Sequence, residues 1–367
     1  MTKRLVVCCD GTWNTPDQRR GGVCSPTNVA KIAAGLARED ADGAPQLLHY
    51  EEGVGTRRFE QVSGVLFGFG LSHNIRDCYR FLVDNYEPGD KLYFLGFSRG
   101  AYTARSTVGL VRNSGILRRE YRDRIGDAYA LYRSRADRAH PRGVGAEIFR
   151  RMYSHEEIEV EFVGVWDTVG ALGIPIDGLP VPFLDKYLGF HDTGLSSRVR
   201  AAYQALAIDE QRGPFTPTLW RQQEHVEDQT LEQVWFAGVH SDVGGGYDDP
   251  SLAEIPLLWM VERARGHGLA FQPDHFRVTD AIPYETDRCM GAEIKPDALG
   301  PIHVSRKGFY RLLERHVREL RQGDGQSAAS SAVRRLRALE EYRPASLARW
   351  VAGDLPVTTV YERAARA

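Results

Sequence analysis

The chain has 367 residues, of which 47 are Lys or Arg and 49 are Asp or Glu, so its formal net charge at pH 7 is -2. This length suffices for one large α/β domain or two smaller ones. The balanced charge without a basic block argues against a nucleic-acid partner, and no apolar run reaches the roughly 20 residues of a membrane-spanning helix.

The first predicted element is a short buried strand at residues 4–14 (RLVVCCDGTWN), whose apolar part is too short for a secretory signal peptide. The cysteines form no Cys-x-x-Cys pair and no Cys/His cluster at zinc spacing, and an odd number without a disulfide framework favours a reducing compartment. They are Cys8, Cys9, Cys24, Cys78 and Cys289. We therefore predict a cytoplasmic protein without cofactor or metal, although delivery by a specialised secretion system is also compatible with these features.

Short apolar runs, each followed by a Gly-rich turn and a helical pattern, recur along the chain. They predict strands at 4–14, 45–56, 90–100, 158–170 and 232–247, and helices at 72–86, 101–115, 251–268 and 331–343. Because the strands are apolar on both faces, they predict an α/β fold with a mostly parallel central sheet and helices on both sides. No internal repeat is present, so we expect a single domain over 1–367.

Several segments depart from this alternation. Residues 170–190 are apolar yet rich in Gly and Pro and follow a strand end directly, which predicts a lid or acyl-pocket wall. An ordinary Pro-rich crossover loop is the alternative, and residues 64–70 (GVLFGFG) are a second candidate for the lid. Residues 322–331 (QGDGQSAASS) are low in hydrophobicity and predict a mobile loop. The interleaved Arg and Asp or Glu residues at 118–138 and 311–321 indicate solvent-exposed helix faces.

The strongest motif is Gly-x-Ser-x-Gly at residues 96–100, between a predicted strand and a predicted helix. This is the pattern of a nucleophile elbow, in which a tight turn presents the serine hydroxyl above the sheet. Gly96 and Gly100 are needed because a Cβ at either position would clash with neighbouring backbone. The motif therefore predicts Ser98 as a nucleophile.

A serine nucleophile needs a base, and the base needs an orienting carboxylate, in the chain order Ser, Asp, His for this architecture. Asp167 and His240 stand at the ends of two later predicted strands and are the expected partners. Asp242 and Asp209 are fallback carboxylates, and His225 and His303 are weaker histidine candidates because neither follows a strand.

An oxyanion hole would complete such a site. The amide of Arg99 opens the helix after Ser98, and the loop after the first strand offers the amides of Gly11 or Thr12. Asp10 in the same loop can instead belong to a hydrogen-bonded turn, and both interpretations can hold together.

Four segments carry a family resemblance over nearly the whole chain. They are CCDGTWN (8–14), GFSRGAYTAR (96–105), GVWDTVGALG (164–173) and VWFAGVHSDVGGGY (234–247), supported by residues 202–220 and 341–347. In this order they resemble the α/β-hydrolase domain known as domain of unknown function 2235, which includes the catalytic part of type VI secretion phospholipase effectors. The resemblance implies an α/β-hydrolase-like fold and a serine esterase or lipase, with the nucleophile at Ser98, the histidine at His240 and the acid at Asp167. Those effectors are usually longer, with membrane-engaging segments, so it leaves phospholipid specificity and a toxin role open.

Two other functions compete with this one. The strand-end Asp10, Asp167 and Asp242 could gather a divalent cation for a metal-dependent phosphoesterase, although Cys8 occupies the position of the nucleophilic Asp in haloacid-dehalogenase-type phosphatases. A non-catalytic binding module on a hydrolase fold is the other alternative. For the serine hydrolase, the expected partners are a small-molecule or lipid ester and transient contact with a membrane surface. The sequence specifies no protein partner.

Overall fold

The computed structural model describes residues 2–11, 14–53, 64–170, 194–223, 226, 228–278 and 293–361. The predicted lid, apart from Gly170, lies outside these residues, as do Thr12 and His225. The second lid candidate, residues 64–70, forms the first turns of helix α2 (Gly64–Asn85).

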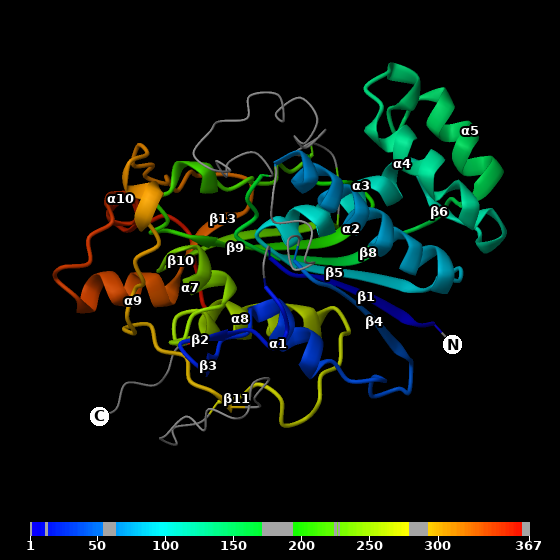
Figure 1. The fold of residues 1–367 in the computed structure, drawn as a ribbon. Helices are drawn as coiled ribbons and strands as arrows, with labels where there is room; N and C mark the ends of the chain where they lie inside the picture. The colour runs from blue at the N-terminus through cyan, green and yellow to red at the C-terminus, as the bar shows by residue number, and fades with distance from the viewer. Residues whose placement is uncertain are drawn as a thin grey trace.

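Eight strands of the described chain form one sheet in the order β14-β13-β10-β9-β8-β5-β1-β4, and every neighbouring pair is parallel (Figure 1). They are β1 (Arg4–Cys9), β4 (Gln46–Glu51), β5 (Lys91–Phe97), β8 (Val160–Trp166), β9 (Val199–Ala207), β10 (Thr230–Phe236), β13 (Gln326–Ala329) and β14 (Val357–Thr358). The predicted α/β fold with a mostly parallel sheet is thereby confirmed.

Helices cover both faces of this sheet (Figure 1). One layer holds α2, α3 (Arg99–Ser114), α4 (Ile125–Arg133) and α5 (Val144–Tyr153). The other holds α1 (Asn28–Gly35), α8 (Glu254–Gly266), α9 (Ser330–Ala338) and α10 (Ala345–Ala352), and the short α7 (His240–Gly244) follows β10. None of the helices in the described ranges combines the length and the apolar character needed to cross a bilayer.

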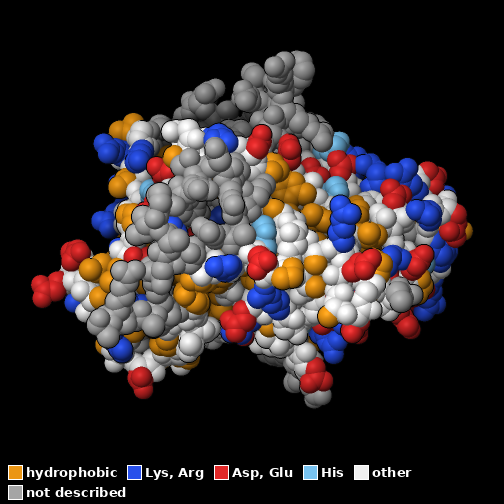
Figure 2. Space-filling model, turned by 90° about the horizontal axis from the view of Figure 1, so that it is seen from below, with side chains coloured by type: hydrophobic (Ala, Val, Ile, Leu, Met, Phe, Trp, Pro, Cys, Tyr) orange, Lys and Arg blue, Asp and Glu red, His pale blue; other side chains and the backbone are white. Residues whose placement is uncertain are grey.

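Smaller elements join these layers. Two-residue strands pair as β2 (Arg19–Arg20) with β3 (Val23–Cys24), β6 (Ile116–Leu117) with β7 (Ser154–His155), and β11 (Arg277–Val278) with β12 (Glu293–Ile294). Single 3-10 turns are η1 (Arg119–Arg124), η2 (Asp137–Ala139), η3 (Gly213–Phe215) and η4 (Gly308–Arg311). Charged side chains of both signs are interspersed on the face that Figure 2 shows, in line with the balanced composition.

The strands are buried on both faces, as their sequences predicted. Along β1, Leu5 and Val7 point into the core under α2 and α3, whereas Val6 and Cys8 belong to the core on the other side. The two-residue alternation of a strand therefore feeds two separate apolar cores, one for each helical layer.

The strand order reverses at β1, which lies between β4 and β5. After β4 is added on one side, the chain crosses back and adds all later strands on the other side. At such a switch point the connections leave in opposite directions, and a crevice opens beyond the carboxyl ends of the two central strands. Cys9 ends β1 and Phe97 ends β5, so Asp10 and Ser98 lie at this crevice.

The expectation of a mobile loop at 322–331 is wrong for most of the segment. Gln326–Ala329 form strand β13, which pairs with β10, and Ser330 begins α9. The low hydrophobicity of this segment suggested an exposed loop, but its polar side chains are buried and hydrogen-bonded. Gln326 Oε1, for example, accepts a bond from Trp235 Nε1 at 3.0 Å.

The cysteines also differ from expectation at one position. Cys8, Cys9 and Cys78 are free and buried, but Cys24 is disulfide-bonded.

Gly100→Ala should destabilise the fold. A Cβ at Gly100 would lie 2.2 Å from the carbonyl oxygen of Cys9 and 2.4 Å from that of Asp10, both backbone atoms that cannot move aside. We expect the free energy of unfolding, measured by chemical denaturation, to fall by about 1–3 kcal/mol. Gly126→Ala in α4 is the matched control, because nothing lies within 4 Å of its added Cβ, and it should be neutral or slightly stabilising. Equal stability of the two variants would contradict this packing.

Candidate active site

Ser98 occupies the one-residue turn between β5 and α3, with φ +59° and ψ -121°. Such a conformation is strained for a residue with a side chain, and this kind of strain concentrates at functional sites. The Ser98 amide donates to the Trp166 carbonyl at 3.0 Å, which ties the turn to the end of β8. Gly96 permits the tight turn, since a Cβ there would lie 2.7 Å from the Gly100 carbonyl oxygen.

Three of the predicted residues meet at this edge of the sheet. His240 Nε2 lies 2.8 Å from Ser98 Oγ, and His240 Nδ1 lies 2.5 Å from Asp167 Oδ2. All three side chains are buried. The imidazole therefore bridges a hydroxyl and a carboxylate, which is the connectivity of a Ser-His-Asp triad.

Asp167 is held by a second partner that the sequence did not suggest. Arg318 Nη1 donates to Asp167 Oδ1 at 2.6 Å and its Nη2 donates to Oδ2 at 3.0 Å, while the Ala207 amide donates to Oδ1 at 3.1 Å. Burial by itself would raise the pKa of Asp167, but the charge of Arg318 and the hydrogen bond with His240 hold that pKa well below its usual range. The carboxylate therefore stays ionised at the centre of the site.

His240 lies between two aromatic rings. Its ring centroid is 4.7 Å from that of Phe97 and 4.9 Å from that of Phe215, which contacts it edge-on. Burial lowers the pKa of His240 below its ordinary value, against the opposing effect of Asp167. At neutral pH the imidazole is thus uncharged, and its Nε2 can accept the proton of Ser98.

The loop that carries His240 is fixed by two acidic side chains. Asp242 Oδ2 accepts from the Val239 amide at 3.0 Å, and Glu210 Oε2 accepts from the His240 amide at 3.3 Å. Asp242 also holds a second histidine, because its Oδ1 lies 2.6 Å from His303 Nδ1. Asp242 is therefore a structural carboxylate of this loop.

The other fallback carboxylate is also engaged elsewhere. Asp209 Oδ2 accepts from the Gly238 amide at 2.7 Å and from the Tyr342 hydroxyl at 2.9 Å. Of the three candidate acids, only Asp167 is hydrogen-bonded to the His240 ring among the described contacts.

The loop after β1 approaches Ser98 with its Gly11 amide hydrogen-bonded within the loop. The Gly11 amide donates to Asp10 Oδ1 at 2.6 Å, although the Cβ position of Gly11 is only 3.4 Å from Ser98 Cβ. Asp10 Oδ2 accepts from the hydroxyls of Thr27 and Tyr50. The turn formed by Asp10 therefore uses the Gly11 amide in this structure, and an oxyanion role for Gly11 stays a prediction.

The strand-end aspartates do not gather into a cation site. Asp10 is bonded to Thr27 and Tyr50, Asp167 to Arg318, and Asp242 to His303. Within the described ranges, the group of metal-ligating side chains that does come together is His49, Glu51 and Cys78, none of which is a strand-end aspartate.

Comparisons with known proteins now identify the family. The sequence matches the family described as "T6SS, Phospholipase effector Tle1-like, catalytic domain" over residues 3–263. This chain belongs to that family. The description of the family names it as a catalytic domain of phospholipase effectors.

Individual relatives are more distant. An uncharacterized protein of Saccharomyces cerevisiae is 29% identical over 234 residues, which are 58% of this chain and 32% of that protein. An uncharacterized protein from Pseudomonas aeruginosa has 17% identity and a TM-score of 0.46, covering 81% of this chain and 49% of its own. The Tle1 effector, solved bound to the VgrG spike of the type 6 secretion system, has 20% identity and a TM-score of 0.33. The match covers 67% of this chain and 51% of the effector chain. The chain thus spans a third to a half of the length of the relatives it matches.

Arg318 is a residue of the candidate site that the sequence did not predict. It lies in the Arg-rich stretch 311–321, which was expected to be an exposed helix face, yet Arg318 is only 2% exposed. Its Nη1 and Nη2 also donate to the carbonyls of Ala207 and Phe215, at 2.8 and 2.5 Å. No spacing or motif marks this arginine, so only the folded chain distinguishes it from its exposed neighbours.

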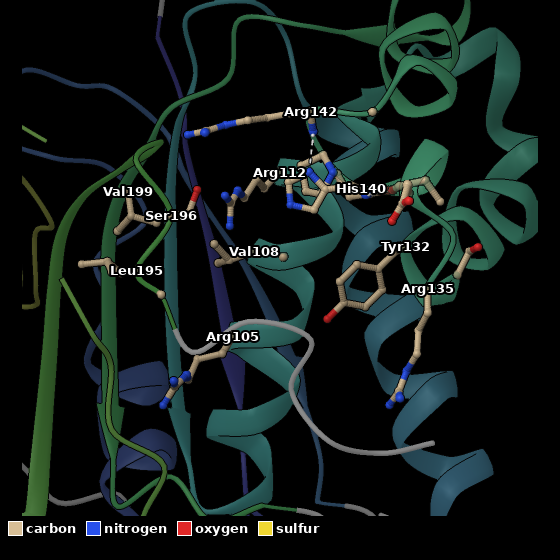
Figure 3. A pocket seen from close by; sticks show the side chains of 18 of the residues that line it. Arg105, Val108, Arg112, Tyr132, Arg135, His140, Arg142, Leu195, Ser196 and Val199 are labelled. Carbon is tan, nitrogen blue, oxygen red and sulfur yellow. Dashed lines mark hydrogen bonds between the residues drawn. The ribbon is translucent and has the colours of Figure 1, made fainter. Parts of the chain in front are cut away.

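A cavity of about 790 Å³ lies beside α3, away from the triad (Figure 3). Arg105, Val108 and Arg112 project into it from α3, opposite Val199, which begins β9, and Leu195, which precedes that strand. Ser98, Asp167 and His240 do not line it. The cavity therefore is not the place where Ser98 would meet a substrate.

Arg318→Met should shift the pH dependence of the candidate site. Without the guanidinium, the pKa of Asp167 rises, so its carboxylate becomes protonated at a higher pH than in the wild type. We expect the acid limb of the rate of Ser98 labelling by a fluorophosphonate to move to higher pH, with a slower rate at neutral pH. Arg318→Lys keeps the charge but not the bidentate hydrogen bonds, so its acid limb should lie between those of the wild type and Arg318→Met. If correctly folded Arg318→Met has the pH profile of the wild type, Arg318 stabilises the fold but does not set the protonation of Asp167.

Proposed function

We propose that this chain is a serine hydrolase that cleaves carboxylic ester bonds of a lipid, within a single catalytic domain over 1–367. The observation that carries the proposal is the pair of hydrogen bonds by which His240 joins Ser98 Oγ to Asp167. The strained turn that presents Ser98 and the family membership support it independently.

In the proposed reaction, His240 Nε2 takes the Ser98 proton as Oγ attacks the ester carbonyl carbon. The resulting oxyanion lies near the amide of Arg99 at the positive end of α3, where such a charge is stabilised. The intermediate collapses, His240 gives its proton to the departing alcohol, and an acyl-serine remains. Water then attacks this acyl group with His240 as base, which releases the carboxylic acid and restores Ser98.

Asp167 and Arg318 act through His240 in this scheme. Asp167 fixes the tautomer that leaves Nε2 unprotonated and stabilises the imidazolium formed during attack. Arg318 holds the carboxylate in place with two parallel hydrogen bonds. Because Arg318 does not touch the reacting atoms, it is a positioning residue.

Ser98→Ala should lower esterase activity roughly a thousandfold or more while leaving stability nearly unchanged. His240→Ala should be about as damaging, and the double variant little worse than either, because the two side chains act as one unit. Asp167→Asn should also be strongly impaired, since its amide favours the wrong imidazole tautomer. Purified variants would be assayed on acyl esters of graded length and on phospholipid vesicles. Full activity of Ser98→Ala, with loss on chelation, would overturn the serine mechanism in favour of a metal-dependent one.

Contact with a lipid surface is the second part of the proposal, and α5 supports it. Val144, Ile148 and Met152 are 63%, 52% and 51% exposed and stand four residues apart, so they form one apolar stripe on the outside of this helix. The opposite side of α5 packs inward through Ala146, and the helix lies at the outer end of its layer (Figure 1).

The charge around this stripe favours an anionic lipid surface. Residues 133–151 hold six arginines, Arg133, Arg135, Arg138, Arg142, Arg150 and Arg151, against only Asp137 and Glu147. An exposed apolar helix face within an arginine-rich segment is typical of helices that lie in a membrane interface. The stripe would hold the domain on the bilayer that contains its substrate.

The double substitution Ile148→Ser and Met152→Ser should weaken binding to vesicles containing anionic phospholipid several-fold, measured by co-sedimentation. Hydrolysis of a soluble short-chain ester should be unchanged, because α5 contains none of the triad residues. Val357→Ser is the matched control, since Val357 is also an exposed apolar residue but lies on the edge strand β14. If the control weakens vesicle binding as much as the double variant does, α5 is not the docking element.

A further inference from the structure

Two free thiols, an imidazole and a carboxylate lie together between β1, β4 and α2. Cys9 Sγ and Cys78 Sγ are 3.6 Å apart, and His49 Nε2 lies 3.2 Å from Glu51 Oε2. The ligand atoms of His49, Glu51 and Cys78 all fall within 4.8 Å of one another. These groups play no part in the proposed hydrolysis.

The sheet register explains how residues so far apart in sequence meet. Cys9 at the end of β1 pairs with Glu51 at the end of β4, and His49 stands two residues earlier, on the same face as Glu51. Helix α2 covers this face and brings Cys78 over the two strands. Because the four residues come from three elements, no local Cys/His spacing in the sequence predicts this cluster.

The surroundings make this cluster unusual for a protein core. Cys9 and Cys78 are fully buried in the apolar core beneath α2. The side chain of Glu51 is only 11% exposed and that of His49 is 24% exposed, so the cluster lies just below the surface. Polar groups in such a place need strong compensating interactions, and a bound cation would supply them. The partly exposed imidazole marks the route by which a small ion can enter.

Two of the distances between these groups match those around zinc. Two thiolates on one tetrahedral zinc, each about 2.3 Å from the ion, lie about 3.8 Å apart, and nitrogen and oxygen ligands at about 2.0–2.2 Å lie about 3.4 Å apart. The observed separations are 3.6 Å between the sulfurs and 3.2 Å between His49 Nε2 and Glu51 Oε2. Thiolate and imidazole ligands select zinc over magnesium or calcium.

We propose that His49, Glu51 and Cys78 bind one zinc ion. Cys9, whose Sγ lies 3.6 Å from that of Cys78, is the nearest further thiol and would complete a tetrahedral set by a small shift of its side chain. The ion would link the edge strand β4 to β1 and to α2. Cys9 immediately precedes Asp10, whose amide donates to the Glu51 carbonyl at 2.9 Å, so the ion would also brace the turn that packs against Ser98.

The test uses the full chain, stripped of metal by a chelator under reducing conditions and then titrated with Co²⁺ or Zn²⁺. We expect one equivalent of Co²⁺ to bind per chain, with the charge-transfer absorption of a cobalt–thiolate bond, and Zn²⁺ to displace it. Zinc should also raise the melting temperature of the wild type. Cys78→Ala and His49→Ala should bind each ion at least tenfold more weakly, and Cys78→Ala should lose the cobalt–thiolate band.

Cys8→Ala is the matched control, because Cys8 is equally buried but points into the core on the opposite face of β1. It should bind both ions as the wild type does. Should Cys78→Ala fail to fold, Glu51→Gln removes a ligand with little change in shape and should show the same loss of affinity. The proposal is overturned if the wild type binds no stoichiometric metal, if Cys78→Ala and Glu51→Gln bind like the wild type, or if the chain purified without reductant carries a Cys9–Cys78 disulfide and no metal. None of these outcomes affects Ser98 labelling by a fluorophosphonate in the stripped chain, so this inference and the proposed function can fail separately.

Discussion

The chain passes from the end of β5 into α3 through one residue, and the geometry of the whole carboxyl edge depends on that turn. Gly100 lets the first turn of α3 lie directly against the carbonyls of Cys9 and Asp10. This contact holds the helix over the crevice between β1 and β5, where the strand order reverses. Ser98 is thereby forced into a positive φ that directs its hydroxyl at His240. The same close approach leaves room for no side chain at Gly96 or Gly100.

Charge at the base of the site is balanced within a very small volume. Asp167 accepts two bonds from Arg318, one from the Ala207 amide and one from His240, which uses all the directions that a carboxylate offers. A buried carboxylate would be costly alone, as would a buried guanidinium, but each satisfies the other. A fully bonded carboxylate cannot rotate, so the imidazole that it holds has one orientation. The four hydrogen bonds to Asp167 therefore both balance its charge and fix the orientation of His240.

The sequence was most informative where a local rule applied. Apolar runs predicted the parallel strands, and the Gly-x-Ser-x-Gly motif predicted the strained turn because its glycines have a backbone reason to be there. The sequence predicted that Asp167 and His240 lie near Ser98 because the carboxyl ends of parallel strands share one edge, and the structure brings the three side chains together. Side chains whose position depends on tertiary contact were not found. Arg318 looked like a surface residue, the polar strand at Gln326 looked like a loop, and the amide of Gly11 looked available although Asp10 uses it.

The position of Arg318 bears on where the functional unit ends. The family match stops at residue 263, which includes all three triad residues, yet the guanidinium that fixes Asp167 and the strands β13 and β14 come from residues beyond it. A fragment cut at the family boundary would carry the complete triad but expose one edge of β10 and leave a buried carboxylate without its counter-charge. Residues beyond 263 therefore contribute directly to the site through Arg318 and to the sheet through β13 and β14. The family match ends at residue 263, whereas the residues that form the candidate site extend at least to Arg318.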